Sequence, residues 1–102
     1  MATNLRFEWD ARKAARNKTK HKLSFELAKE VFFDPFALTD LDGYEHGEDR
    51  WRTIGAIGNA LIVVIHTARE DKADEEVVRI ISARRADPKE RHRYEEGAKA
   101  RR

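Results

Sequence analysis

The chain has 102 residues, which suits one compact domain with a single modest core. Apolar residues make up 40% of it and charged residues 39%, and because the charges are of both signs the composition argues against a disordered chain. The absence of cysteine excludes disulfides and thiolate chemistry. The longest strongly apolar run, Leu61 to Ile65, is too short to cross a bilayer, and the first ten residues lack the apolar segment of a signal peptide. These features predict a cytoplasmic protein with no membrane span.

The net charge of +2 hides an uneven distribution of charge along the chain. Residues 10–22 include six basic residues and one acidic residue. Residues 34–49 include six acidic residues and no Lys or Arg, whereas residues 79–102 include nine basic residues and four acidic ones. Basic segments that are separate from an acidic segment suit an anionic partner such as nucleic acid. Each charge taken singly is equally consistent with an ordinary solvated surface.

The first third of the chain predicts a strand followed by two helices. Residues 5–10 form the strand candidate, and Asp10 can cap a helix over residues 11–20. Ser24 can cap a second helix over residues 25–33, which Pro35 ends. On the strand, Leu5, Phe7 and Trp9 share one face. The apolar stripe of the first helix is Ala11, Ala14 and Ala15, and the expected buried side of the second is Leu27, Ala28, Val31 and Phe32.

The middle of the chain changes to the period of strands. The pattern predicts a strand over 36–42, a polar loop over 42–49 and a hairpin over 51–67. The hairpin is expected to turn at Gly58 and Asn59, because glycine adopts a positive φ without a Cβ clash. A charged loop over 69–76 and a strand over 77–85 follow. Apolar residues on both faces of 61–67 and 77–83 indicate central, doubly covered strands.

A last helix is signalled by Asp87 as N-cap, Pro88 at its first position and Glu90 three residues after the cap, with Gly97 past its end. The element order predicts an α+β fold with a mainly antiparallel sheet, two N-terminal helices and a C-terminal helix. We expect the helices to cover one face of the sheet. Residues 1–97 are predicted to form one domain, and residues 98–102 a basic tail.

Three stretches of the sequence resemble the BrnT family of bacterial type II toxins. They are FEWDARKAARNKTKH from Phe7, HT.R from His66 and RIISARRA...ER..Y from Arg79, and the similarity extends from Phe7 to Gly97. The resemblance implies a small ribonuclease with a RelE-like fold, which acts in the cytoplasm by cleaving RNA and inhibiting translation. It also implies a BrnA-like antitoxin, whose ribbon-helix-helix part binds DNA and whose remainder covers the toxin. The toxin would then meet DNA only indirectly.

The chain departs from the family pattern at two places. Lys22 stands where the family usually has a glycine. A helix end there favours glycine in the left-handed conformation, and a lysine costs roughly 1 kcal/mol more. The segment Glu70–Glu76 also makes the loop before the last strand longer than is typical of the family.

Arg84 and Arg85 are the first candidates for catalysis, because they stand where an apolar strand ends. Metal-independent RNA cleavage commonly uses the ribose 2′-hydroxyl as nucleophile, so the protein must orient that group and stabilise charge on the phosphate. An arginine binds phosphate oxygens at two points and stays protonated. On a regular strand Arg79 and Arg85 share one face and Arg84 lies on the other. An equally weighted alternative is that one of the pair is a structural ion-pair partner.

Four further residues are assigned near the phosphate. The resemblance in HT.R implies that Arg69 is a second phosphate clamp, although its spacing alone suits an exposed loop arginine. Thr67 can donate a hydrogen bond to a phosphate oxygen, or it can be present only because threonine is common in strands. Arg79 and Arg91 are predicted to bind RNA.

Two residues are candidates for proton transfer. His66 lies in a core strand and titrates in a useful range, but a hydrogen-bonded core histidine is at least as good an interpretation. Tyr94 can stack on a base or give a proton to the leaving oxygen, but packing of the last helix on the sheet is slightly preferred. No pair of histidines has the spacing of metal ligands, so no metal or other cofactor is expected.

The leading hypothesis is therefore a metal-independent endoribonuclease toxin, which is neutralised by a BrnA-like antitoxin. A non-catalytic nucleic-acid-binding module is the second hypothesis, and composition alone favours it because basic patches bind more often than they cut. The third is a protein-interaction domain whose charges serve only a partner. RNA cleavage by the isolated chain separates the first hypothesis from the other two.

Overall fold

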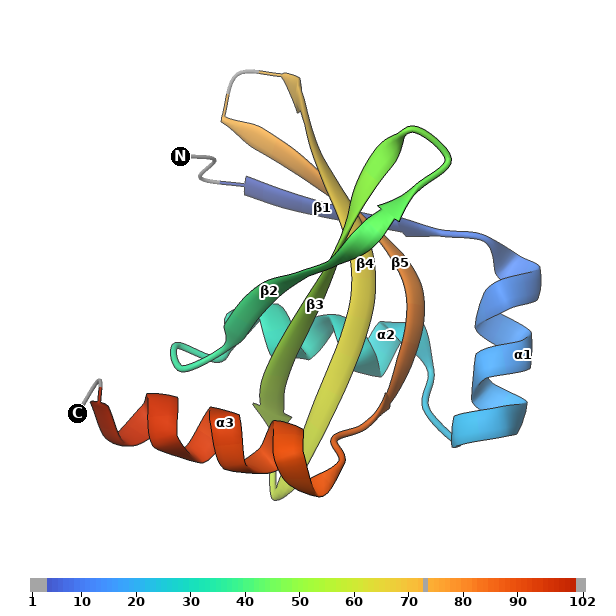
Figure 1. The fold of residues 1–102 in the computed structure, drawn as a ribbon. Coiled ribbons are helices and arrows are strands. Elements are labelled where there is room, and N and C mark those ends of the chain that lie inside the picture. The colour runs from blue at the N-terminus through green and yellow to red at the C-terminus, as the bar shows by residue number, and fades with distance from the viewer. Residues whose placement is uncertain (1–3, 73, 101–102) are drawn as a thin grey trace.

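The computed structural model describes residues 4–72 and 74–100, and its fold is α+β (Figure 1). Five strands, three α-helices and one 3₁₀ helix follow one another along the chain. They are β1 (Asn4–Trp9), α1 (Ala11–His21), α2 (Phe25–Ala28), the 3₁₀ helix η1 (Lys29–Phe33), β2 (Leu38–Glu45), β3 (Glu48–Ile57), β4 (Ala60–Lys72), β5 (Glu75–Arg85) and α3 (Pro88–Ala100). The second predicted helix is thus one α-helical turn that continues as a 3₁₀ helix.

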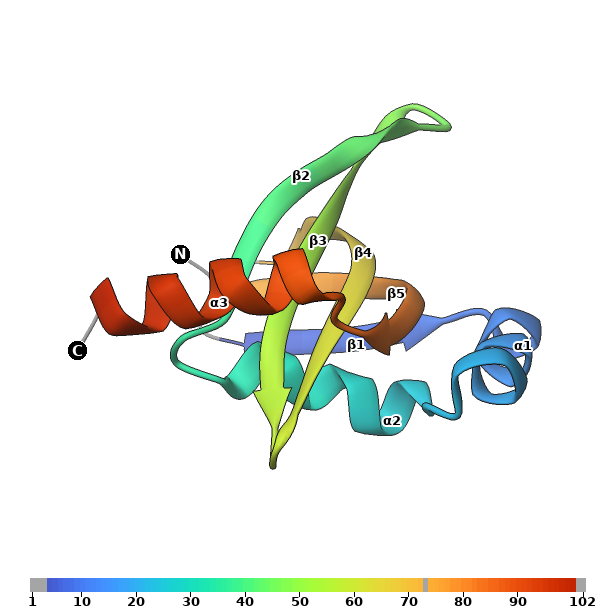
Figure 2. The ribbon, with the colours of Figure 1, turned by 60° about the horizontal axis from the view of Figure 1, so that its bottom comes forward.

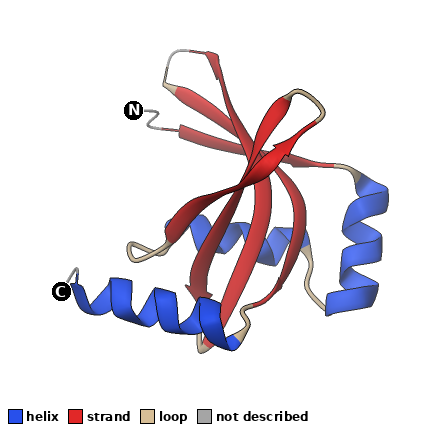
Figure 3. Cartoon of the chain, viewed as in Figure 1, coloured by secondary structure: helices blue, strands red, loops and turns tan. Residues whose placement is uncertain are grey.

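The strands form one sheet in the order β1-β5-β4-β3-β2 (Figure 3). The β2–β3, β3–β4 and β4–β5 pairs are antiparallel, whereas β1 runs parallel to β5. The sheet is therefore mixed, and the sequence analysis did not anticipate its parallel pair. The strand β4 is central, which explains why Leu61 to Val64 are all buried.

Helices cover both faces of the sheet, so the prediction that they share one face is wrong (Figure 2). The helices α2 and η1, with Ala14 of α1, pack on the face that carries Ile62, Val64 and Ile80, which we call the α2 face. The helix α3 packs through Tyr94 and Ala98 on the opposite α3 face, whose members are Ile54, Leu61 and Val63. The physical reason is that β4 is apolar on both sides, and each side must be removed from water.

A β-bulge in β5 decides which side chains share a face. Ile65 pairs with Ser82 and His66 pairs with Ile80, so Ile81 is an extra residue on β5. The alternation along β5 shifts at this point. Beyond the bulge Arg84 pairs with Val63 and therefore lies on the same face as Arg79, which pairs with Thr67. The prediction that Arg79 shares a face with Arg85 is wrong because it assumed a regular strand.

The helix α1 is held at the edge of β5 by a buried polar residue, Asn17. The strand β1 stops at Trp9, opposite Ile80, which leaves the later part of β5 without a strand on that side. There the Asn17 side chain accepts a hydrogen bond from the Ala83 amide (3.0 Å) and donates one to the Leu23 carbonyl (3.1 Å). It thereby satisfies the Ala83 amide, which a strand would otherwise pair, and the Leu23 carbonyl between α1 and α2.

The predicted buried sides of the two N-terminal helices need correction. Among the three alanines of α1 only Ala14 is half-buried, while Ala11 and Ala15 are exposed. In the second helical segment the predicted burial of Ala28 and Val31 is confirmed, whereas Leu27 is 44% exposed. Phe25, Ala28 and Val31 are all fully buried and lie three residues apart, the repeat of a 3₁₀ helix, so the buried side begins at Phe25 and leaves Leu27 outside it.

Two predicted loops are parts of longer hairpins. The strands β2 and β3 extend to a two-residue turn at His46 and Gly47, both with positive φ (53° and 81°). The strands β4 and β5 extend through most of the charged segment 69–76, and Asp74 in their turn has a φ of 63°. Segments 42–49 and 69–76 are polar because they are mostly exposed strand ends, not loops. The predicted turn at Gly58, with a φ of 60°, is confirmed.

The cap predictions for α1 and α3 are confirmed at their N-termini. Asp10 accepts hydrogen bonds from the amides of Arg12 and Lys13, and Asp87 and Glu90 bond each other's amides in a capping box. Gly97, however, does not end α3, which continues to Ala100. A Cβ on Gly97 would lie 3.3 Å from Leu38, so the glycine allows α3 to lie close on β2. Residues 101 and 102 of the predicted basic tail lie outside the described residues.

The C-terminus of α1 supports a stability prediction. Lys22 has a φ of 61° and a ψ of 28°, and its amide donates to the Lys18 carbonyl. We expect Lys22→Gly to raise the free energy of unfolding by about 1 kcal/mol, because glycine adopts this conformation without a Cβ clash. Urea unfolding measures the change. Lys22→Ala, which keeps the Cβ, is the matched control and should change stability little, so a gain of similar size in both variants would contradict the explanation.

Candidate nucleic-acid interface

The open part of the α3 face is rich in arginine. The helix α3 covers one end of this face, and side chains of β1, β3, β4 and β5 lie beyond it. Arg79 of β5 lies there, paired across strands with Thr67 of β4, and Arg69 lies two residues further along β4. Thr67 itself is buried. The structure therefore brings together three of the predicted site residues.

Each arginine of this open face is bound to a carboxylate. Arg79 forms an ion pair with Glu48 at the start of β3. Arg69 donates to Glu8 of β1 at 3.2 Å. The remaining pairs are Arg6 with Asp71 and Glu75, Arg50 with Glu45, and Arg52 with Asp40 and Asp42. A phosphate that approaches this surface must compete with carboxylates of the chain itself.

Sequence reasoning missed Glu48, Arg50 and Arg52 as members of this surface. All three alternate along β3 with a period of two, and Arg52 pairs across strands with Ile65 on the α3 face. The signal was present in the alternation of charged and other residues, but the polarity of residues 42–49 suggested a loop.

Arg84, whose side chain is 37% exposed, is fixed by a two-point ion pair. Its guanidinium donates to both carboxylate oxygens of Glu90 at 2.7 and 2.8 Å, and also to the carbonyl of Arg85. The hydrogen bond from Arg84, together with that from the Asp87 amide, holds the pKa of the buried Glu90 below its ordinary value. The end of β5 is thereby fixed to the first turn of α3, which is a structural role for Arg84.

Arg85 and Arg91 are exposed, and neither forms an ion pair within the described residues. Arg85 pairs across strands with Ile62, so it starts from the α2 face while Arg84 starts from the α3 face. The two adjacent arginines thus point in opposite directions. Arg91 is an exposed residue of α3.

His66 lies on the α2 face, on the other side of the sheet from Arg79. Its Nδ1 lies 3.2 Å from the Thr67 carbonyl, which can only accept, so Nδ1 carries the proton and Nε2 accepts from the Thr53 hydroxyl at 2.7 Å. Burial lowers the pKa of His66, so the ring is neutral at pH 7. Phe32 packs edge-on against it at 4.8 Å. These contacts are those of a core histidine.

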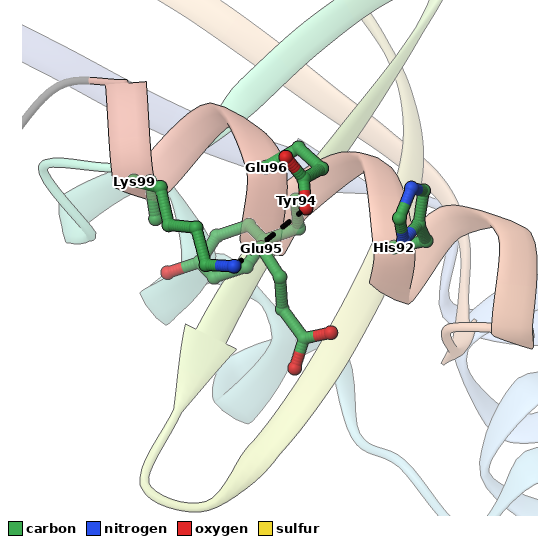
Figure 4. Close-up of a pocket in the computed structure, with 6 residues that line it drawn as sticks. His92, Tyr94, Glu95, Glu96 and Lys99 are labelled. Carbon is green, nitrogen blue, oxygen red and sulfur yellow. Dashed lines mark ion pairs between the residues drawn. The ribbon is translucent and has the colours of Figure 1, made fainter.

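Tyr94 is buried between α3 and the sheet, and its hydroxyl donates to Asp34 at 2.6 Å. The same carboxylate accepts from the Ala56 amide at 2.8 Å. The hollow that includes Tyr94 is lined by α3 alone and has a volume of about 530 Å³ (Figure 4). Glu96 and Lys99 form an ion pair of 3.8 Å across its rim. None of the open-face arginines lines it.

Residues 4–72 and 74–100 contain no group of three or more His, Asp or Glu side chains that could hold a metal ion. Within the same residues no helix is long and apolar enough to cross a membrane.

Comparison with known proteins places the chain in a family. Residues 9–90 match the model of the ribonuclease toxin BrnT of type II toxin–antitoxin systems, and this match covers most of the chain. It includes Trp9 at the end of β1, the arginines of β3, β4 and β5, and α3 as far as Glu90. A search of the curated proteins gave no match. The chain therefore belongs to the BrnT family of ribonuclease toxins of type II toxin–antitoxin systems.

Proposed function

We propose that the chain is an endoribonuclease with a RelE-like fold, which cleaves RNA without a metal and thereby inhibits translation in the cytoplasm. The observation that supports it best is the open sheet surface that carries Arg69 and Arg79 in a member of a ribonuclease family. Arginine side chains there suit the charge of an RNA backbone.

The proposed reaction uses the RNA itself as the nucleophile. The 2′-hydroxyl attacks the adjacent phosphorus, the new O2′–P bond forms, and the O5′–P bond breaks to leave a 2′,3′-cyclic phosphate and a 5′-hydroxyl. A proton leaves O2′ and another reaches O5′. Arg79 and Arg69 stabilise the negative charge that builds on the phosphate oxygens. Thr67 is buried, so no contact with the phosphate is assigned to it.

His66 and Tyr94 have no place in this proposed reaction. Both side chains are buried and hydrogen-bonded to other protein groups, and His66 is on the other side of the sheet. Glu48 is a better candidate for proton acceptor, since its carboxylate contacts Arg79 on the open face. Arg84 is proposed to hold the fold, and Arg85 and Arg91 to contribute only peripheral charge.

The family implies an antitoxin partner, and we propose that this partner is BrnA-like, with a ribbon-helix-helix part that binds DNA. The toxin then meets DNA only through the antitoxin. Exposed arginines such as Arg69 are the surface that an inhibitor must cover. A neighbouring reading frame for a small ribbon-helix-helix protein would support this partner.

A non-catalytic nucleic-acid-binding module is the second candidate. The observation in its favour is that neither predicted proton-transfer residue, His66 or Tyr94, reaches the arginine surface. A cleavage assay separates the two functions.

The first prediction concerns the chemistry of cleavage. The purified chain should shorten a labelled RNA in EDTA and leave a 2′,3′-cyclic phosphate, because the nucleophile belongs to the RNA. A 2′-deoxy substitution at the cleaved nucleotide should block the reaction, which gel analysis of both substrates can show. Activity that disappears in EDTA and returns with Mg²⁺ would overturn the metal-free mechanism.

The second prediction separates Arg79 from Arg84. Arg79→Ala should lower the single-turnover cleavage rate by about a hundredfold, the usual loss for one charged donor at a transition state, while its melting temperature stays near that of the parent. The Arg79–Glu48 pair is partly exposed and therefore contributes little to stability. Arg84→Ala should instead lower the free energy of unfolding by about 2 kcal/mol, because it leaves the buried Glu90 unpaired.

The Arg84→Ala effect should depend on pH in a defined direction. Because the folded chain lowers the pKa of Glu90, the ion pair stabilises the fold above the ordinary carboxyl pKa of 4.5, and this contribution is lost as pH falls below it. Urea unfolding at pH 7 and pH 3 measures the difference between parent and variant. An equal difference at both pH values would show that Arg84 acts through packing rather than charge.

The third prediction concerns the carboxylate that covers Arg79. Glu48→Gln should tighten the binding of a 2′-O-methyl RNA severalfold, because it removes an anion that competes with phosphate for Arg79. Fluorescence anisotropy measures the affinity, and Glu95→Gln, an exposed position on α3, controls for the change in net charge. Equal tightening in both variants would mean that only net charge matters.

A further inference from the structure

The largest group of unpaired cations lies on α1, outside the arginine surface described above. This helix carries five Lys or Arg residues, and none of them forms an ion pair within the described residues. They are Arg12, Lys13, Arg16, Lys18 and Lys20. Asp10 is the acidic group nearest in sequence, and its side chain accepts hydrogen bonds from the amides of Lys13 and Arg12. These hydrogen bonds, together with the charges of Lys13 and Arg16, lower the pKa of Asp10. These cations remain available to an external anion.

Part of this charge lines a hollow between α1 and β5. The hollow has a volume of about 280 Å³, and no carboxylate lines it. Its lining residues are Lys13, Arg16, Asn17, Lys20 and His21 of α1 with Ile81 and Ser82 of β5. Figures 1 and 2 show α1 beside the later half of β5, where β1 no longer pairs with that strand. We call this feature the α1 hollow.

The α1 hollow adjoins the surface around Arg79. A smaller hollow of about 90 Å³ contains Arg79, Glu48, Arg50 and His46, and it shares Lys13 and Ile81 with the α1 hollow. Ile81 is the extra residue of the bulge, so the bulged residue lines both hollows. One continuous path therefore runs from the cations of α1 to the proposed phosphate clamp.

The lining favours a nucleic-acid backbone over a protein partner. Protein interfaces usually have an apolar centre with aromatic residues, whereas Ile81 is the one large apolar side chain that lines the α1 hollow. Lysine, arginine and serine side chains are the groups that contact phosphates and sugars. The exposed apolar side chains Leu5 and Leu41 belong to other strands, and neither lines this hollow.

We propose that the α1 hollow binds the phosphates of the RNA strand next to the cleaved bond, and that Lys13, Arg16 and Lys20 hold them. This inference rests on the proposed function, because it extends the same substrate path from Arg79. Arg79 is paired with a carboxylate, so the free cations of α1 supply the initial attraction for RNA. The α1 hollow then sets the direction in which the RNA strand crosses β5.

The test uses neutral substitutions on one helix. Lys13→Gln, Arg16→Gln and Lys20→Gln remove charge from the hollow, whereas Arg12→Gln and Lys18→Gln remove the same charge from positions that do not line it. Binding of a 2′-O-methyl RNA is measured by anisotropy over a range of salt concentrations, and thermal unfolding confirms that each variant is folded. Cleavage of unmodified RNA by the parent chain is measured in parallel.

Each hollow variant should bind RNA severalfold more weakly than the two controls, and its salt slope should fall by about 0.7, the value for one lost phosphate contact on a single strand. If the parent cleaves RNA but hollow and control variants bind it equally, the hollow proposal fails while the proposed function stands. If the parent neither binds nor cleaves RNA, both fail. If the hollow variants keep RNA affinity but lose affinity for poly-glutamate, the hollow is a protein-docking surface and the proposal is overturned.

Discussion

One extra residue in β5 determines the arrangement of the charged side chains. Because Ile81 is bulged out opposite Ile65 and His66, the alternation of β5 shifts, and Arg84 comes to the same face as Arg79. Without the bulge Arg84 would face α2, and the two-point ion pair with Glu90 that ties β5 to α3 could not form. Ile81 also lines both the α1 hollow and the smaller hollow around Arg79. The bulge therefore links the packing of α3 to the shape of the proposed RNA path.

The charges then divide into two classes with different physical roles. On the open sheet face each arginine has a carboxylate neighbour, such as Glu48 beside Arg79, so this surface is close to neutral until a ligand displaces the pairs. The cations of α1 have no such partners among residues 4–72 and 74–100, and they keep their long-range attraction for an anion. An RNA strand would meet α1 first and the paired arginines second. Asn17 makes this arrangement possible, since it fixes α1 to the unpaired edge of β5.

Local signals predicted much of the fold, and the errors have identifiable causes. The caps at Asp10 and Asp87 and the turn at Gly58 depend on neighbouring residues only, and each was correct. The bulge at Ile81 has no such local signal, because an apolar run of β5 continues across it and only the pairing with β4 defines it. The positions of the helices on two faces likewise depend on long-range packing. For the same reason the sequence indicated arginine chemistry but could not tell the structural Arg84 from the open Arg79.

The central claim is that RNA lies on the α3 face, along the path from α1 to Arg79. Its most direct test is NMR of the isotope-labelled chain titrated with a 2′-O-methyl RNA that cannot be cleaved. The account predicts the largest amide shifts at α1 and at Ile81 and Ser82, with little change at Phe32 and Thr39, which line a hollow on the α2 face. Shifts concentrated at Phe32 and Thr39, with α1 unchanged, would contradict it.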